Sequence, residues 1–159
     1  MADGLSGFDV LVIGVGNAGL AAALSAHEKG AKVLVLECAP KDFRAGNSRH
    51  TRDLRCKHDA PTKVMAGAYT EDEFYKDILS VTEGKTHEKL ARMMIRASTE
   101  CTEWMTSYGV RFQKALGGTL QLGRTNAFFL GGGKNMMNAY YARQNAWAFM
   151  SSTTLRSSI

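Results

Sequence analysis

Three glycines near the start of the chain have the spacing G-x-G-x-x-G, which is suited to holding a phosphate group. Gly14 permits a sharp turn, Gly16 lets the backbone approach a pyrophosphate, and Gly19 lets the following helix pack closely on a strand. Asn17 and Ala18 lie in the same run, where the unpaired N–H groups of a helix N-terminus and the helix dipole favour an anion. We therefore predict that these five residues contact the pyrophosphate of a dinucleotide.

An acidic residue follows this run at the distance expected in a dinucleotide site. Glu37 lies roughly 20 residues after the glycines, where its carboxylate can accept hydrogen bonds from both hydroxyls of an adenosine ribose. A carboxylate at this point disfavours a ribose that carries a 2′-phosphate. In the alternative interpretation, the glycines serve only to pack the helix onto the sheet. The pattern itself leaves open which dinucleotide binds.

The hydrophobic pattern predicts the elements that position these residues. Residues 8–13 form an apolar run rich in β-branched side chains, which indicates a buried strand. Residues 18–29 are rich in Ala and Leu and end at Gly30, which predicts a helix with a left-handed cap. Residues 32–37 predict a second buried strand. The span 8–37 is therefore a βαβ unit, and the predicted fold class is α/β with a parallel, Rossmann-type sheet.

The composition suits one domain. The chain has 159 residues, of which 45% are hydrophobic, enough to bury a core. We expect no membrane span, because no run approaches roughly 18 apolar residues, and we expect a cytoplasmic protein, because the N-terminus lacks the pattern of a secretory leader. Cys38, Cys56 and Cys101 lie far apart, which predicts neither a disulfide framework nor a metal site.

The formal net charge of +5 is concentrated in one segment. A nucleic-acid-binding protein would more often spread its basic residues along a helix face or over a surface. Here they crowd a short stretch: Lys41, Arg44, Arg49, Arg52, Arg55 and Lys57. This placement predicts a local anionic ligand and no nucleic-acid partner.

The chain after the second strand does not continue as a nicotinamide-binding fold would. Residues 42–57 are polar and basic without periodicity, which predicts a loop, and residues 70–109 predict a helical segment. Thr70 and Glu73 form a capping-box pattern that opens a helix with Phe74, Ile78 and Val81 on its inner face.

A second helix is predicted to begin at Thr86 and to end at Gly109. Its expected core stripe recurs every three or four residues and consists of Leu90, Met93, Ala97, Cys101, Trp104 and Tyr108. Residues 110–112 predict a short strand.

The run from Gly46 to Arg55, G-N-S-R-H-T-R-D-L-R, resembles a loop of the flavoprotein subunits in the fumarate reductase and succinate dehydrogenase superfamily. In that superfamily a G-G-N-S or G-G-N-T loop wraps FAD, and Ala45 stands where another glycine is common. The strongest likeness is to the FAD-dependent tricarballylate dehydrogenases. This resemblance implies that FAD is the cofactor and that Asn47 and Ser48 reach its pyrophosphate and ring.

Three further residues of this loop have alternative roles. Arg49 and Arg52 each carry a guanidinium that can hold a phosphate or a substrate carboxylate through a forked pair of donors, or can remain a solvated loop charge. His50 lies in R-H-T, which approximates the S-H-T sequence through which some superfamily members attach FAD covalently. We favour either a noncovalent contact between His50 and the flavin or a loop histidine with satisfied hydrogen bonds.

A second run resembles the same dehydrogenases. Residues 124–134 read R-T-N-A-F-F-L-G-G-G-K, and residues 138–141 read N-A-Y-Y, as in the helix that follows this motif in the family. We predict a glycine-rich turn and a helix over residues 131–143. Gly131, Gly132 and Gly133 form either a backbone nest for an anion or a flexible turn.

The resemblance implies both a fold and a reaction. It implies an FAD-binding domain of which residues 1–143 are the N-terminal part, cut off before its C-terminal half and before a capping domain. The implied reaction is dehydrogenation of a tricarboxylate or dicarboxylate, of the tricarballylate to cis-aconitate type, with electrons passing to a partner protein or quinone. The proton-transferring arginine of the cap would lie beyond this chain, so no catalytic residue is assigned. Two alternatives remain, a dinucleotide-binding fragment for FAD or NAD and an inactive truncated product.

The resemblance ends at Arg143. Residues 144–159 show no heptad, no alternation and no core face, and we regard them as an aberrant tail. With synonymous third bases chosen freely, the neighbouring reading frame of this segment can encode AERLGIHVEYDAEVVH, which resembles the helix end and strand of the family. We therefore expect that a frameshift has replaced the native continuation.

Overall fold

The computed structural model describes residues 7–115, 122–143 and 148–151. The chain divides into two compact units. Residues 1–51 and 133–159 belong to the first unit, and residues 52–132 form the second unit. Each unit has its own small sheet.

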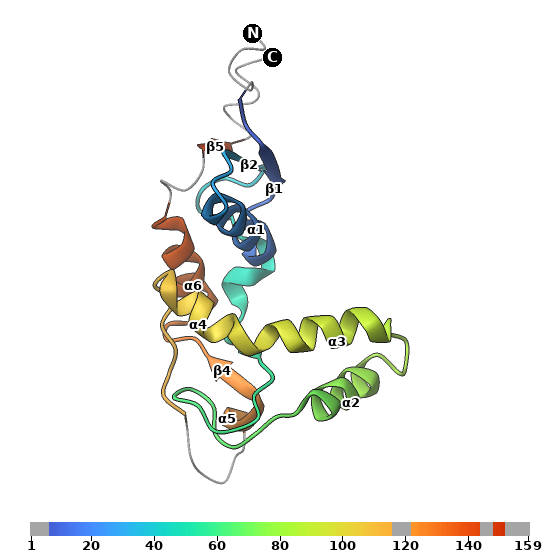
Figure 1. Cartoon of the computed structure of the whole chain (residues 1–159). Helices are drawn as coiled ribbons and strands as arrows, with labels where there is room; N and C mark the ends of the chain where they lie inside the picture. Colours follow the sequence, from blue (N-terminus) through green and yellow to red (C-terminus); the bar gives the residue numbers. More distant parts are fainter. Residues whose placement is uncertain (1–6, 116–121, 144–147, 152–159) are drawn as a thin grey trace. The chain divides into compact units, whose positions relative to one another are not determined.

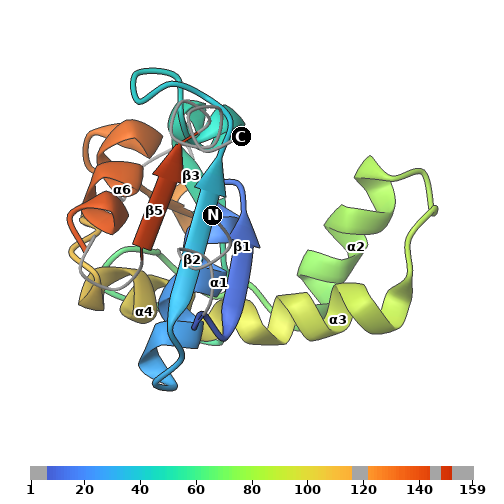
Figure 2. The same ribbon diagram turned by 90° about the horizontal axis from the view of Figure 1, so that it is seen from above.

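Three parallel strands form the sheet of the first unit, in the order β1-β2-β5. These strands are β1 (Val10–Ile13), β2 (Val33–Glu37) and β5 (Ala148–Ser151). Val10 pairs with Val33, and Leu34 pairs with Ala148. Figure 2 shows the three strands side by side, with helix α1 (Asn17–Glu28) against one face of the sheet. The parallel sheet predicted from the sequence is confirmed.

Helix α1 connects β1 to β2 and completes the predicted βαβ unit. Its inner face buries Leu20, Ala23 and Leu24. Gly30 follows the helix with a φ of +85°, a left-handed conformation that side chains disfavour. The local pattern over residues 8–37 therefore predicted both the elements and their order.

Strand β5 lies within residues 144–159, the segment whose sequence shows no heptad, alternation or core face. β5 pairs with the edge of β2 opposite β1 through backbone N–H and C=O groups, and this pairing needs no alternating side-chain pattern. Residues 144–147 and 152–159 lie outside the described residues.

Two helical elements complete the described part of the first unit. Helix α6 (Gly132–Tyr141) buries Met136, Met137 and Tyr140. The 3-10 helix η1 (Gly46–His50) lies inside the segment predicted as a loop. Such a short turn leaves no recognisable periodicity.

An antiparallel pair of strands forms the sheet of the second unit, namely β3 (Asp53–Arg55) and β4 (Asn126–Phe128). Helix α5 (Leu122–Thr125) precedes β4. β3 also falls in the predicted loop, because three residues are too few to show alternation. The strand predicted over residues 110–112 is reduced to an isolated bridge between Phe112 and Phe129.

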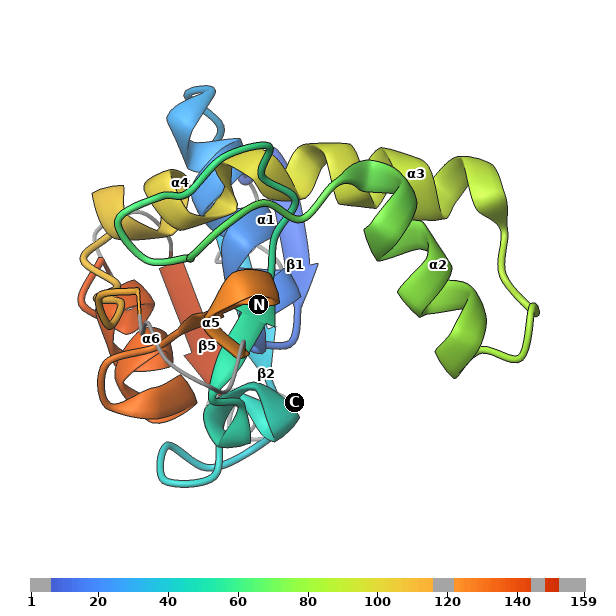
Figure 3. The same cartoon turned by 90° about the horizontal axis from the view of Figure 1, so that it is seen from below.

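The predicted helical segment forms helices in the second unit: α2 (Glu71–Val81), α3 (Glu88–Ala97), η2 (Ser98–Glu100) and α4 (Cys101–Ser107). Figure 1 and Figure 3 both show α2 and α3 side by side. Thr70 caps α2 as predicted, since its hydroxyl accepts a hydrogen bond from the N–H of Glu73. The Glu73 carboxylate accepts a hydrogen bond from the backbone of Thr70, which completes the predicted capping box, and it also binds Arg124 at 2.7 Å.

Three details of these helices differ from the predictions. Val81, expected on the inner face of α2, is 83% exposed at the last turn. The cap of α3 is His87, whose Nδ1 accepts the N–H of Leu90, in place of Thr86. The core face of α3 uses Ala91 and Ile95, so the predicted stripe is wrong at its beginning: Leu90, Met93 and Ala97 are exposed.

In the described ranges of the chain, every helix is too short or too polar to cross a membrane.

Candidate functional site: a glycine turn at the end of a parallel strand

The turn between β1 and α1 presents a helix N-terminus at the carboxyl end of a parallel strand. Gly14 has a φ of +95°, which only glycine adopts without strain, and turns the chain out of β1. Gly16 is the N-cap of α1, and no side chain of its own caps the helix. The first turn of α1 contains no acidic residue that would neutralise the helix dipole. This end of α1 therefore favours an anion.

Two glycines of the turn have different steric environments. A Cβ added to Gly19 would overlap the carbonyl oxygen of Gly14, so only glycine allows this approach of helix to strand. A Cβ added to Gly16 would lie 3.5 Å from Oγ of Ser48 and 3.7 Å from the Ala45 oxygen, which are ordinary contacts. Gly19 is thus required for packing within the protein, whereas packing leaves room for a side chain at Gly16.

Glu37 ends β2 directly beside this turn. Its carboxylate is 9% exposed and accepts the N–H of Val15 at 3.1 Å and the N–H of Ala39 at 2.8 Å. Burial raises the pKa of Glu37, but hydrogen bonds from Ala39, Val15 and Cys38 outweigh this effect, and the pKa falls below its ordinary value of 4.5. An ionised carboxylate has roughly four acceptor positions, and the hydrogen bonds from Ala39, Val15 and Cys38 already use most of them.

Ser48 is the loop residue that the structure brings to the helix N-terminus. Its hydroxyl accepts the backbone N–H of Asn17 at 3.0 Å, and its own N–H donates to Ala45. Ala45 is buried and has a φ of +82°, in the left-handed region where glycine is preferred. The left-handed backbone of Ala45 sets the direction of the chain at the start of η1 and thereby positions Ser48.

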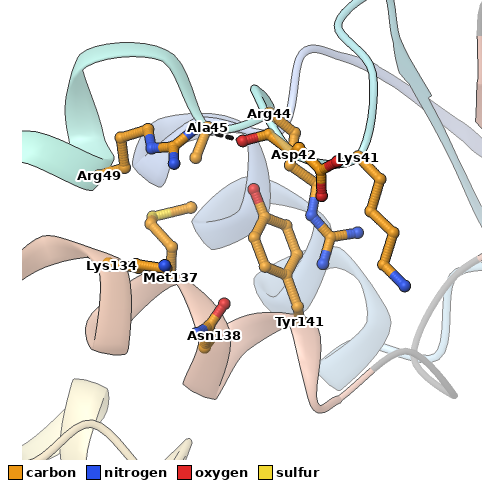
Figure 4. A pocket seen from close by; sticks show the side chains of 9 residues that line it. All are labelled: Lys41, Asp42, Arg44, Ala45, Arg49, Lys134, Met137, Asn138 and Tyr141. Atoms are coloured by element: carbon orange, nitrogen blue, oxygen red, sulfur yellow. Dashed lines mark hydrogen bonds between the residues drawn. The ribbon is translucent and has the colours of Figure 1, made fainter.

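The other predicted loop residues lie elsewhere. The side chains of Asn47 and His50 are exposed, and within the described residues neither forms a hydrogen bond to the glycine turn. Arg49 lines a cavity beside α6, where its Nη1 donates to the backbone oxygen of Asp42 at 2.5 Å (Figure 4). Ala18 is exposed on the first turn of α1.

Sequence reasoning assigned no role to Tyr141 of α6. Its hydroxyl donates to the backbone oxygen of Val15 at 3.0 Å, and the Arg44 guanidinium lies 3.7 Å above its ring. Burial raises the pKa of Tyr141 to about 12, with smaller opposing effects of the nearby charges. The residue type was a usable signal, because a buried tyrosine hydroxyl needs a hydrogen-bond partner, but the pattern could not name Val15.

The basic residues between Lys41 and Lys57 do not all line one site. Lys41, Arg44 and Arg49 line the cavity in the first unit. In the second unit, Arg55 pairs with Asp77 and Lys57 pairs with Asp59, so these two cations have partners within the protein. The expected local anion site is therefore limited to the first half of the segment.

The backbone of the glycine triplet at the start of α6, Gly131 to Gly133, makes hydrogen bonds within the protein. The N–H of Gly132 donates to Phe129, and the N–H of Gly133 donates to Thr51 at 2.7 Å. A Cβ at Gly133 would also overlap the backbone oxygen of Ser48. Two of the amides that an anion nest would need are thus occupied, and the triplet forms a hydrogen-bonded turn that allows close packing.

The glycine turn lies in a region of the chain that is similar to a known protein family. The model of the family described as FAD binding domain matches residues 9–149. NADH:fumarate oxidoreductase from Klebsiella pneumoniae is 32% identical over 110 residues, which are 65% of this chain and 11% of that protein. Vinyl phenol reductase from Lactiplantibacillus plantarum is 26% identical over 106 residues, 67% of this chain and 21% of the relative.

Solved structures show the same fold. The 3-ketosteroid-Δ4-(5α)-dehydrogenase from Rhodococcus jostii RHA1 superposes with a TM-score of 0.73 at 18% identity, covering 94% of this chain and 39% of that structure. A flavocytochrome c3 fumarate reductase superposes with a TM-score of 0.66 at 23% identity, covering 94% and 28% respectively. The chain thus spans between about a tenth and two fifths of the length of these proteins.

Proposed function

The chain belongs to the FAD binding domain family, with FAD as its cofactor, and we propose that the glycine turn, Glu37 and Ser48 bind the adenosine and pyrophosphate half of FAD. The main support for this proposal is that the N-terminus of α1, whose first turn has no acidic residue, lies beside the buried, ionised carboxylate of Glu37. The positive end of the helix dipole attracts a pyrophosphate, and the Glu37 carboxylate can accept hydrogen bonds from the hydroxyls of a ribose.

The residues around the glycine turn are suited to binding FAD. Space for a Cβ at Gly16 indicates that glycine is used there for the approach of a ligand, because packing within the protein does not require it. The hydroxyl of Ser48 already lies at the helix N-terminus, so it can exchange its bond to Asn17 for one to a phosphate oxygen. Asn47 and His50 are proposed to contact the flavin half, on the resemblance of their loop to the superfamily, whereas Arg49 lines the cavity beside α6.

The proposed activity belongs to a longer protein that contains this domain. We infer that such a protein dehydrogenates a dicarboxylate or tricarboxylate, of the tricarballylate to cis-aconitate type, and passes electrons to a partner protein or quinone. When bound, FAD supplies the hydride acceptor. The residues of this chain hold and orient it. The support is the likeness of residues 46–55 and 124–134 to the tricarballylate dehydrogenases, together with a fumarate oxidoreductase among the relatives.

The activity can be tested after the reading frame has been restored at Arg143 in the coding DNA. We expect the repaired gene to encode a longer flavoprotein that reduces a dye acceptor with tricarballylate and retains FAD. A flavin-loaded product that oxidises none of tricarballylate, succinate and citrate would contradict the proposed substrate class. A neighbouring frame that encodes no further domain would contradict the frameshift.

A second candidate function is the binding of a dinucleotide without turnover. The described site offers donors and acceptors for a dinucleotide, and we assign none of its residues to proton transfer. A purified chain that is yellow and keeps its flavin through gel filtration, yet is not reduced by any of the carboxylates, is the result expected of this function. An inactive truncated product would not retain flavin.

A further inference from the structure

The first unit contains a cavity of about 350 Å³ between the loop after β2 and helix α6 (Figure 4). Its volume lies at the lower end of the range of small-ligand pockets, about 300–1,000 Å³. The cavity therefore suits a compact molecule better than a whole dinucleotide. None of the residues of the glycine turn lines it, nor does Glu37.

Basic side chains from both elements converge on this cavity. Lys41, Arg44 and Arg49 come from the loop and Lys134 from α6. Within the described residues, none of these four cations forms an ion pair with a carboxylate. Asp42 contributes the one carboxylate of the lining, so the cavity has a formal excess of three positive charges.

The two arginines are held in place by contacts that leave donors for a ligand. Arg44 stacks on the Tyr141 ring at 3.7 Å, which uses the face of the guanidinium and leaves its N–H edge. Arg49 is anchored through Nη1 to the backbone oxygen of Asp42. A guanidinium has five N–H donors in a fixed fork that matches a carboxylate or phosphate.

We propose that this cavity binds a compact anion with two or more negative charges, either a phosphate monoester or a di- or tricarboxylate. The site is separate from the dinucleotide turn. Tyr141 belongs to both regions, because its ring lines the cavity and its hydroxyl holds the Val15 oxygen of the turn. This proposal rests on the four basic side chains of the cavity, and it does not require that the protein dehydrogenate a carboxylate.

The test is isothermal titration calorimetry of the 159-residue chain at low ionic strength, with inorganic phosphate and with tricarballylate as probes. We expect saturable binding of at least one probe, and the tighter probe identifies the class of anion. The R44M/K134M double variant should weaken binding at least about tenfold, because two of four cations are lost. K134M alone serves as a second variant, since Lys134 is exposed and its loss leaves the Arg44 stack intact.

The matched control removes the same charge from the same unit. Lys29 and Lys32 are exposed and lie outside the cavity, so K29M/K32M should bind the probes as the unchanged chain does. An equal loss in this control, or no saturable binding of either probe by the folded chain, would overturn the proposal. Circular dichroism of each variant shows that it is folded.

A competition experiment tests whether the site is separate. FAD carries the adenosine and pyrophosphate that the glycine turn is proposed to hold, and it has no terminal phosphate that could itself enter the cavity. The affinity for phosphate or tricarballylate should be the same with and without FAD. Displacement of either probe by FAD would contradict a separate site, and would leave the assignment of FAD to the turn intact.

Discussion

The hydroxyl oxygen of Ser48 lies 3.0 Å from the backbone nitrogen of Asn17 and accepts its hydrogen bond. A residue of η1 thus satisfies the first N–H of α1, which Gly16 cannot do because it has no side chain. The loop that the sequence relates to FAD-binding proteins is thereby held at the N-terminus of α1. This contact links the two motifs of the proposed site.

Replacing Ser48 by alanine should destabilise the first unit by about 1 kcal/mol, as the loss of a helix cap does. The midpoint of urea unfolding, followed by circular dichroism, measures this change. Ser25 is an exposed serine of α1, so S25A is the matched control and should be neutral or slightly stabilising. Equal stabilities of S48A and the unchanged chain would show that the cap is unimportant.

Alanine at Gly19 and at Gly16 should have opposite effects on folding and binding. G19A places a Cβ against the Gly14 backbone and should destabilise the fold by about 3 kcal/mol. G16A meets only ordinary contacts and should change the free energy of unfolding by less than about 1 kcal/mol, yet weaken FAD binding. Unfolding curves and FAD titrations of both variants check this. Unchanged FAD affinity in G16A would remove the proposed role of Gly16.

The second unit should lose stability in acid through Glu71. Hydrogen bonds from Arg96 and Arg92 lower the pKa of Glu71 from 4.5 to about 2. A carboxyl whose pKa is depressed by folding stabilises the fold fully above its ordinary pKa, and this contribution is lost as the pH falls from about 4.5 through about 2. Urea midpoints at a series of pH values should therefore decrease over this window.

The variant E71Q should show a weaker pH dependence in the same window, because it cannot titrate. Glu83 is exposed and lies outside the network of Arg92 and Arg96, so E83Q is the control and should behave as the unchanged chain. Identical pH profiles for E71Q and the unchanged chain would contradict the role of Glu71.

The outer face of β1 should promote association. Leu11 is 55% exposed and Ile13 is 81% exposed, although both lie in a parallel sheet, where both faces are usually covered. L11T/I13T should reduce light scattering and dye binding, with a change in stability below about 0.5 kcal/mol. V12T is the contrasting control, because Val12 is buried and the added hydroxyl should destabilise by about 1–3 kcal/mol. Unchanged association of L11T/I13T would contradict this prediction.

The sequence predicted best where the local pattern alone determines the structure. The βαβ unit follows from the apolar runs and glycines, and the parallel pairing of Val10 with Val33 is as expected. The burial of α3 was less predictable. Leu90 and Met93 continue a stripe of helical period, but Ala91 and Ile95 fit the same period, and only the packed partner decides which face is buried.

Tertiary contacts explain the remaining differences. Thr86 and His87 are adjacent candidates for the cap, and His87 is the residue with extended backbone whose side chain accepts the N–H of Leu90. The contact of Tyr141 with Val15 joins residues far apart in sequence, which periodicity cannot reveal. For the site, motif spacing led to the predictions for the turn and Glu37, and the family resemblance led to that for Ser48, but neither could show that Arg49 lines a cavity beside α6.

The most direct test of the central claim is a fluorescence titration of the chain with FAD, comparing the unchanged protein with E37Q. The account predicts at least about tenfold weaker FAD binding in E37Q, because an amide cannot replace an ionised acceptor of the ribose hydroxyls. E100Q, which changes an exposed carboxylate of the second unit, should bind FAD normally. Equal FAD affinities of folded E37Q and the unchanged chain would contradict the assignment of Glu37 and of the adenosine site.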